Sequence, residues 1–204
     1  MKIIKQTRLI LFVLIAIYLA GCTLPKTSIE NLSEVKPNEV IFVGKIQLIP
    51  HIKKNEVIYK NMINLSDIEP YQVLYMKASD KFYDLNGNQS LDMTDSIAVL
   101  DGKYFYFTWP QGKPLNILGV SFITRSTGRN LDTMTFTIKK GVKVKYPGNA
   151  KAVYLGTISF KRDEFFNIKK IDVNQRHFAK ARKEFRKKYR TKMNLAKAKL
   201  SSSR

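Results

Sequence analysis

The single cysteine of this chain, Cys22, stands at the end of a segment whose residue types fit export. Three basic residues occur within the first eight positions, and an unbroken apolar run of eleven residues follows at 9–19. Eleven residues are too few to cross a bilayer as a helix, which takes about 20. A basic start, a short apolar run and small residues before a cleavage point are typical of a secretory signal. A simple signal anchor with an incidental cysteine is the alternative.

Residues Leu19-Ala20-Gly21-Cys22 resemble the lipobox of bacterial lipoproteins. The resemblance implies transfer of a diacylglyceryl group, with fatty acids such as palmitate, to the Cys22 thiol, cleavage before Cys22, and acylation of the new amine. Thr23 follows the cysteine where Asp would imply inner-membrane retention, so the resemblance implies the outer membrane if the host has two membranes. The expectation is therefore an exported, lipid-anchored protein of the cell envelope, on either the periplasmic or the surface face.

The composition is that of a basic globular domain. Removing 21 of the 204 residues leaves 183, and the three basic residues lost lower the net charge from +20 to about +17. A lipid on Cys22 leaves no thiol for a disulfide, so the fold depends on its hydrophobic core. The chain is 44% hydrophobic and 11% aromatic, which is enough to build one.

Oxygen-bearing side chains recur between residues 84 and 95 at the spacing of a calcium loop. The segment resembles the loops of EF-hand and dockerin proteins, and the ligands that this resemblance implies are Asp84, Asn86, Asn88, Ser90, Asp92 and Asp95. Gln89 stands where such a loop needs the sharp turn that Gly supplies, and Asp95 is shorter than the usual Glu. We expect either weak calcium binding or a plain Asn-Gly hairpin turn.

The C-terminal segment is strongly basic and has a helical period. Residues 174–204 contain twelve Lys or Arg and one acid, Glu184. Apolar residues recur at spacings of three and four from Phe178 to Leu200, which predicts one amphipathic helix with Asn174 as its N-cap. The candidate residues for an anionic surface are Lys180, Lys183, Arg186, Lys187, Lys188 and Arg190.

Three interpretations of this segment remain open. The helix packs on the domain as a solvated basic helix, lies on anionic lipid or lipopolysaccharide, or binds another polyanion. Nucleic acid is disfavoured by the expected compartment. We expect the part up to about Tyr189 to dock and the Lys-rich remainder to be free.

Between these two segments the period is that of β-strands. Short apolar or alternating runs are separated by turn signals, which favours a mainly β fold, an antiparallel β-sandwich with a C-terminal amphipathic basic helix. The expected division is a signal at 1–21, a lipidated tether at 22–38, the sandwich at 39–172, and the basic helix and tail at 173–204. The expected strands are 40–49, 56–63, 72–76, 103–109, 115–124, 133–138 and 152–160.

The run Asp101-Gly102-Lys103-Tyr104-Phe105-Tyr106-Phe107, followed by Pro110-Gln111-Gly112-Lys113, resembles transthyretin-like and Cna-B-like sandwich modules. In those modules a turn and an aromatic strand precede a proline-glycine turn and a second strand. The resemblance implies a stalk, carrier-binding or surface module rather than a catalyst.

Residue types suited to catalysis are sparse. His51 and His177 are the only histidines, and neither has an acidic neighbour in the sequence. The chain has no nucleophile elbow, phosphate loop or HExxH motif. We therefore expect a non-enzymatic structural or interaction role with unknown protein partners. The alternative is an envelope hydrolase whose carboxylates or histidine converge only on folding.

Overall fold

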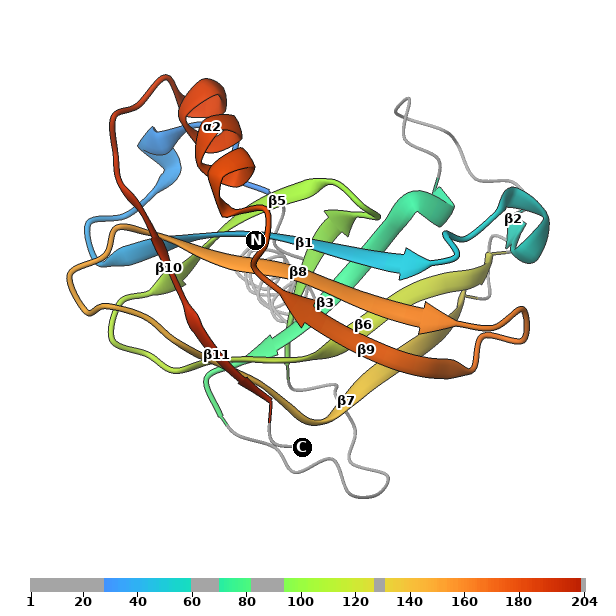
Figure 1. The fold of residues 1–204 in the computed structure, drawn as a ribbon. Helices are drawn as coiled ribbons and strands as arrows, with labels where there is room; N and C mark the ends of the chain where they lie inside the picture. The colour runs from blue at the N-terminus through green and yellow to red at the C-terminus, as the bar shows by residue number, and fades with distance from the viewer. Residues whose placement is uncertain (1–27, 60–69, 82–93, 127–130, 203–204) are drawn as a thin grey trace, which may run out of the picture.

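Two β-sheets packed face to face organise the computed structural model, which describes residues 28–59, 70–81, 94–126 and 131–202 (Figure 1). The first sheet has the order β10-β8-β1-β5, with β9 also paired to β8. Its strands are β1 (Glu39–Ile49), β5 (Tyr104–Pro110), β8 (Ala152–Arg162), β9 (Ile168–Asn174) and β10 (Leu195–Lys197). The fold is therefore the mainly β sandwich that the alternating runs predict.

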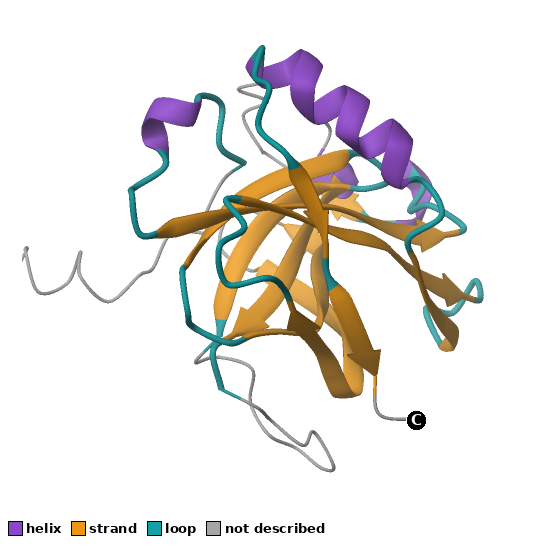
Figure 2. Ribbon diagram, turned by 60° about the vertical axis from the view of Figure 1, so that its left-hand side comes forward, coloured by secondary structure: helices purple, strands orange, loops and turns teal. Residues whose placement is uncertain are grey.

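The second sheet has the order β11-β7-β6-β3-β4, with β2 also paired to β6. Its strands are β2 (Ile58–Tyr59), β3 (Val73–Ser79), β4 (Asp95–Leu100), β6 (Leu115–Ser126), β7 (Leu131–Lys145) and β11 (Lys199–Ser202). The short 3₁₀ helices are η1 (Leu32–Glu34), η2 (Lys54–Glu56) and η3 (Pro70–Gln72), and the α-helix is α2 (Phe178–Tyr189). Helix α2 lies across the outside of the sandwich (Figure 2).

The sheets are mixed rather than wholly antiparallel. Strand β8 runs parallel to both β1 and β10, and β2 runs parallel to β6. Parallel neighbours need a long connection, and β1 and β8 are joined by about a hundred residues that include strands β2 to β7. The expected antiparallel pairing thus holds for most pairs but not for the centre of the first sheet.

Strand β1 is buried on both faces, which explains its continuous apolar run. Val40 and Phe42 point into the core between the sheets, whereas Ile41 and Val43 belong to a second core on the outer face of the first sheet. Gly44 then marks a shift of register between β1 and β8. A Cβ at Gly44 would come within 2.6 Å of the Phe105 ring, so the close packing at this point requires glycine.

The C-terminal segment differs from the single long helix expected. Helix α2 ends at Tyr189, where Arg190 takes a left-handed conformation (φ 46°), and His177 rather than Asn174 stands at its N-cap. Beyond it, β10 and β11 form, with Leu195 and Ala198 almost fully buried. Alternation of apolar and basic residues from Ala196 to Leu200 fits period two, so strand pairing prevails over the helical pattern.

Part of the segment that the sequence assigns to the tether packs on the domain. Ile29 is only 7% exposed, and its N–H donates to the Tyr106 carbonyl at 2.9 Å. The Tyr106 N–H in turn donates to the Ser28 hydroxyl at 3.2 Å. Residues 28–38, which the sequence assigns to the tether, therefore begin against the free edge of β5. Residues 22–27, and Cys22 with them, lie outside the described residues.

Candidate functional site

Helix α2 docks through one apolar face, as its period predicts. Ala181 and Phe185 are fully buried, and Phe178 and Tyr189 flank them. They pack on the outer face of the first sheet, against a cluster that contains Ile41, Val43, Tyr106, Ala152, Tyr154 and Leu195. The Phe185 ring lies 5.3 Å from Tyr189 and 6.4 Å from Tyr106. Docking as far as Tyr189 is thus confirmed, whereas a free Lys-rich remainder is wrong.

The opposite face of α2 is a basic surface. Its candidate residues are all exposed: Lys180, Lys183, Arg186, Lys187, Lys188 and Arg190. We call this set the α2 basic face. Within the described part of the chain, the one ion pair that it forms joins Lys188 to Glu30 at 2.8 Å. The remaining five members of the set have no acidic partner within salt-bridge distance among the described residues.

The positive charge extends from α2 onto the first sheet. Lys45 on β1 lies over the Tyr104 ring, 5.1 Å from its centroid. Burial and the nearby ammonium groups of Lys180 and Lys103 lower the pKa of Lys45. Cations from a strand, a turn and the helix therefore face one another at the border of the α2 basic face.

Residues 28–35 fasten the C-terminal end of α2 to the sheet. The Tyr189 hydroxyl donates to the Ile29 carbonyl at 2.8 Å, and Leu32 and Val35 pack on the same apolar cluster. Burial, with Glu184 adding to it, raises the pKa of Tyr106 to about 12, and burial also raises the pKa of Tyr189. Both phenols therefore stay protonated and neutral around neutral pH. The start of the described chain and the basic helix thus form one unit.

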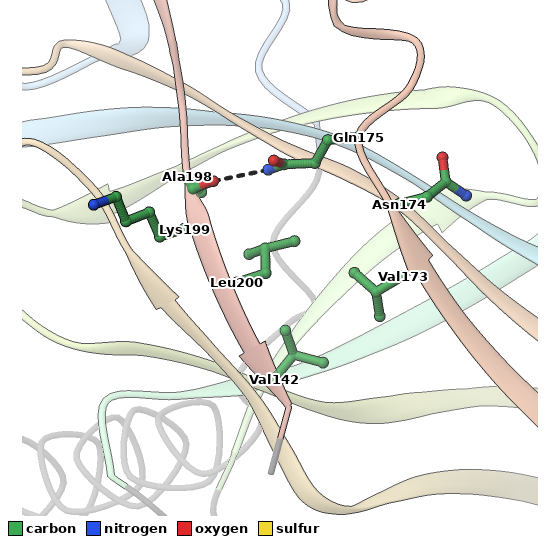
Figure 3. A pocket seen from close by; sticks show the side chains of 7 residues that line it. All are labelled: Val142, Val173, Asn174, Gln175, Ala198, Lys199 and Leu200. Atoms are coloured by element: carbon green, nitrogen blue, oxygen red, sulfur yellow. Dashed lines mark hydrogen bonds between the residues drawn. The ribbon is translucent and has the colours of Figure 1, made fainter. Parts of the chain in front are cut away.

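A pocket of about 460 Å³ opens where the two sheets separate between β9 and β11 (Figure 3). Val142, Val173 and Leu200 line its apolar part. At its rim the Gln175 side-chain amide donates to the Ala198 carbonyl at 2.9 Å, with longer contacts to the Tyr154 and Leu155 carbonyls. Gln175 therefore joins β8 to Ala198, which lies between β10 and β11. Lys199 is the one charged residue of the lining, so the pocket offers no acid–base pair.

A smaller pocket of about 330 Å³ lies at the opposite seam, where β4 passes to β5. Val99, Leu100 and Phe105 give it an apolar wall, and Glu30 and Lys188 stand at one side. Because these two charges pair with each other, they are occupied by the contact that holds residues 28–35 to α2. This pocket too lacks a catalytic arrangement.

Folding brings His51 to an acid that the sequence does not indicate. Its Nδ1 lies 2.7 Å from Asp101 Oδ2, across 50 positions of sequence. The other carboxylate oxygen of Asp101 accepts the Leu48 N–H at 2.9 Å, so Asp101 also holds the end of β1. The His51 side chain is 64% exposed, and neither residue lines the pockets described above. His177 is an exposed residue at the start of α2.

The predicted calcium loop lies outside the described residues except for Thr94 and Asp95. Asp95 is the first residue of β4 and pairs with Ala78 of β3. Across the described ranges, no three His, Cys, Asp or Glu side chains gather as a metal site would require. Calcium binding at Asp84, Asn86, Asn88, Ser90, Asp92 and Asp95 stays a prediction.

The chain matches no known family model, no curated protein and no solved structure. Among the described residues there is no helix long and apolar enough to cross a membrane. The likeness to bacterial lipoproteins and to transthyretin-like or Cna-B-like modules therefore remains an expectation from sequence motifs. What the structure adds is a sandwich that carries a docked, outward-facing basic helix.

Proposed function

We propose that this protein is an outer-membrane lipoprotein, anchored through lipid on Cys22, with a non-enzymatic structural or interaction role in the cell envelope. We further propose that the α2 basic face rests on anionic lipid or lipopolysaccharide. The observation that carries the proposal is the packing of residues 28–35 against α2. A lipid on Cys22 would then lie on the same side of the molecule as the basic helix.

The length of chain between anchor and domain is short. Six residue steps separate Cys22 from Ser28, so the two lie at most about 22 Å apart. Ser28 is hydrogen-bonded to Tyr106, and the next residue to Tyr189 of α2. A lipid on Cys22 would therefore keep α2 close to the bilayer surface. This proximity would raise the local concentration of headgroups around the helix.

The charges on α2 suit such a surface. Each basic residue near an anionic leaflet contributes about 1 kcal/mol of attraction. Members of the α2 basic face without an acidic partner keep that attraction available for an external anion. The same charges would attract any polyanion, but a tethered domain meets headgroups first, which is why we propose the lipid surface.

Flotation with vesicles tests the proposal. The lipidated protein should float with phosphatidylcholine vesicles. The unlipidated Cys22→Ser chain, made without residues 1–21, should float only when the vesicles contain anionic lipid or lipopolysaccharide. Adding Lys183→Glu and Lys187→Glu to the Cys22→Ser chain should weaken anionic binding by at least about tenfold at low salt. Palmitate labelling should be lost with Cys22→Ser.

A matched control, Lys81→Glu with Lys145→Glu, reverses the charge of two exposed lysines of the second sheet. Lys81 follows β3, and Lys145 ends β7. This pair makes the same change in net charge but should leave most of the binding intact. Equal losses in both double variants would mean that net charge alone, and not the α2 basic face, attracts the vesicle. Undiminished palmitate labelling of Cys22→Ser would refute the anchor.

A further inference from the structure

The exposed large apolar side chains gather at the end of the sandwich away from α2. Among the described residues these are Ile49 at 39%, Ile58 at 51% and Phe165 at 74% exposed. Ile49 closes β1 and pairs with Lys161, just before the β8–β9 turn that carries Phe165. Strand β2, with Ile58, lies at the same end (Figure 1). We call this group the apolar tip.

The turn that presents Phe165 is held by Asp163. One carboxylate oxygen of Asp163 accepts the backbone N–H groups of Phe165 at 2.9 Å and Asn167 at 2.8 Å. The other oxygen binds the Asn167 amide at 3.1 Å and Lys169 at 2.9 Å. The hydrogen bond from Lys169 is the main reason that the pKa of Asp163 is lowered, so the carboxylate stays ionised. Phe165 is thus displayed by a closed set of contacts.

The neighbouring Phe166 faces the other way and anchors the turn. It has a φ of 62°, an uncommon conformation for a non-glycine residue, and its ring lies 5.5 Å from Phe122. The Arg162 guanidinium stacks on it at 4.5 Å. The side chain of Arg162 is itself fully buried and makes five hydrogen bonds, to Pro50 O, His51 O, Asp163 O and both carboxylate oxygens of Glu56. The base of the turn is therefore rigid, and Phe165 stands out from it.

The charges of the β8–β9 turn are nearly balanced. Segment 161–172 has four basic residues and three acids, and Glu56 supplies the fourth acid. Lys161 and Lys170 both pair with Asp172, at 3.3 and 3.0 Å. The same end of the sandwich also carries Lys53 and Lys54 beside Glu56, and Arg125 opposite Ile58, so it keeps part of the positive charge of the chain.

The small apolar area of the tip favours a lipid surface over a protein partner. A large aromatic side chain buries about 150–250 Å², so one Phe with two half-exposed Ile falls far short of the roughly 800 Å² per partner of a stable protein interface. A single protruding ring is sufficient for shallow insertion at the boundary between headgroups and acyl chains. A tethered domain needs only such a weak contact, because the tether supplies a high effective concentration.

We propose that the apolar tip inserts Phe165 into the lipid bilayer, as a second membrane contact beside the α2 basic face. The tether that brings it there is part of the function proposed above, on which this inference rests. Strand β8 begins at Ala152, under α2, and ends at Arg162 at the turn, so the two contacts lie about 33 Å apart along the strand. The first sheet, rather than the second, then faces the bilayer.

Phe165→Trp in the lipidated full chain provides the test. The native Trp109 is 2% exposed and donates its indole N–H to the Pro114 carbonyl, so its emission reports little of the surface. On phosphatidylcholine vesicles whose acyl chains are brominated, the emission of the introduced indole should shift to shorter wavelength and be quenched, equally at low and physiological salt. Thr135→Trp, exposed on β7 of the second sheet, should be unaffected.

Flotation in the same tubes separates this inference from the proposed function. If the chain floats but the indole introduced by Phe165→Trp is not quenched, the insertion is wrong and the anchor stands. If the chain does not float, the anchor is wrong. A blue shift seen only in native envelopes, and absent from vesicles, would also refute insertion into the bilayer and would indicate a protein partner. Phe165→Ser in the Cys22→Ser chain should weaken its binding to vesicles that contain anionic lipid by at least about tenfold.

Discussion

The two ends of the first sheet present opposite surfaces. At one end α2 buries its aromatic residues under itself and exposes basic side chains, of which Lys188 alone has an acidic partner among the described residues. At the other end the β8–β9 turn pairs its charges and exposes an aromatic ring, Phe165. The comparison shows that a high net charge does not make every surface of a molecule basic. If both ends meet a membrane, as we propose, the contact through α2 should depend on salt and the contact through Phe165 should not.

The comparison predicts its largest contrast for two phenylalanines. Phe185→Ala should lower the free energy of unfolding by about 3–5 kcal/mol, because it leaves a cavity beneath α2. Phe165→Ala should change that free energy by less than about 0.5 kcal/mol, because the side chain is largely exposed. Urea unfolding of the two variants measures both values. Similar values for the two variants would mean that the burial of Phe185 and the exposure of Phe165 are wrongly assigned.

The base of the turn is the next test. Arg162→Met should cost about 3 kcal/mol, since it leaves the Glu56 carboxylate without its buried partner. Glu164→Gln, an exposed carboxylate next to Phe165, serves as the control and should be neutral. If Arg162→Met were as neutral as the control, the rigidity assigned to the turn would be mistaken.

The same ion pair predicts a pH dependence. The hydrogen bond from Arg162 holds the pKa of Glu56 below its ordinary 4.5, so the folded protein binds this proton less readily than the unfolded chain. The pair's contribution is complete above pH 4.5 and is lost as the pH falls through the lower folded value. Urea unfolding of wild type and Glu56→Gln should therefore differ at about pH 6 and converge as the pH falls below 4.5 and through the folded value. A constant difference would exclude this carboxylate as the cause.

Strand β10, which follows α2, tests whether the segment after the helix stabilises the domain. Leu195→Ala should destabilise the protein by about 2 kcal/mol or more, because Leu195 is 2% exposed under the helix. Truncation after Arg190, which removes β10 and β11, should be more harmful still. A truncated chain as stable as the full one would restore the free tail that the sequence predicts.

Much of the sandwich was predictable because its signal is local. Strands β1, β5, β6 and β8 appear where apolar runs end at proline or glycine turns, for example at Pro50. Strands β4 and β9 were not predicted, and β9 has a mixed pattern because its outer face bears lysines. The C-terminal strands were missed because Leu200 fits a period of four as well as a period of two. These residues become strands because β10 pairs with β8 and β11 pairs with β7, and such distant partners cannot be read from the local sequence.

The candidate site divides in the same way. The docked face of α2 and its exposed cations follow from a 3.6-residue period, so they could be predicted residue by residue. The clamp of Ile29 on Tyr106 and the contact of His51 with Asp101 could not, because each joins positions at least 50 apart. The display of Phe165 depends on an acid two residues earlier, a signal present in the sequence but common to many turns.

The smallest expected effect concerns the second sheet. If residues 84–95 bind calcium, millimolar calcium should raise the melting temperature by a few degrees, because only the folded loop gathers its oxygens. Asp84→Ala with Asp92→Ala should remove that rise. Neither change should affect vesicle binding, which we assign to the first sheet. No shift with calcium would reduce the segment to a hairpin turn.

Lysine labelling of the vesicle-bound full chain tests most directly which side of the sandwich faces the membrane. An amine-reactive reagent is applied to the protein with and without anionic vesicles, and each lysine is quantified by mass spectrometry. We expect Lys183 and Lys187 to become protected on the vesicles, while Lys81 and Lys145, on the side of the second sheet, are labelled as before. Protection of Lys81 and Lys145, with Lys183 and Lys187 still labelled, would contradict it.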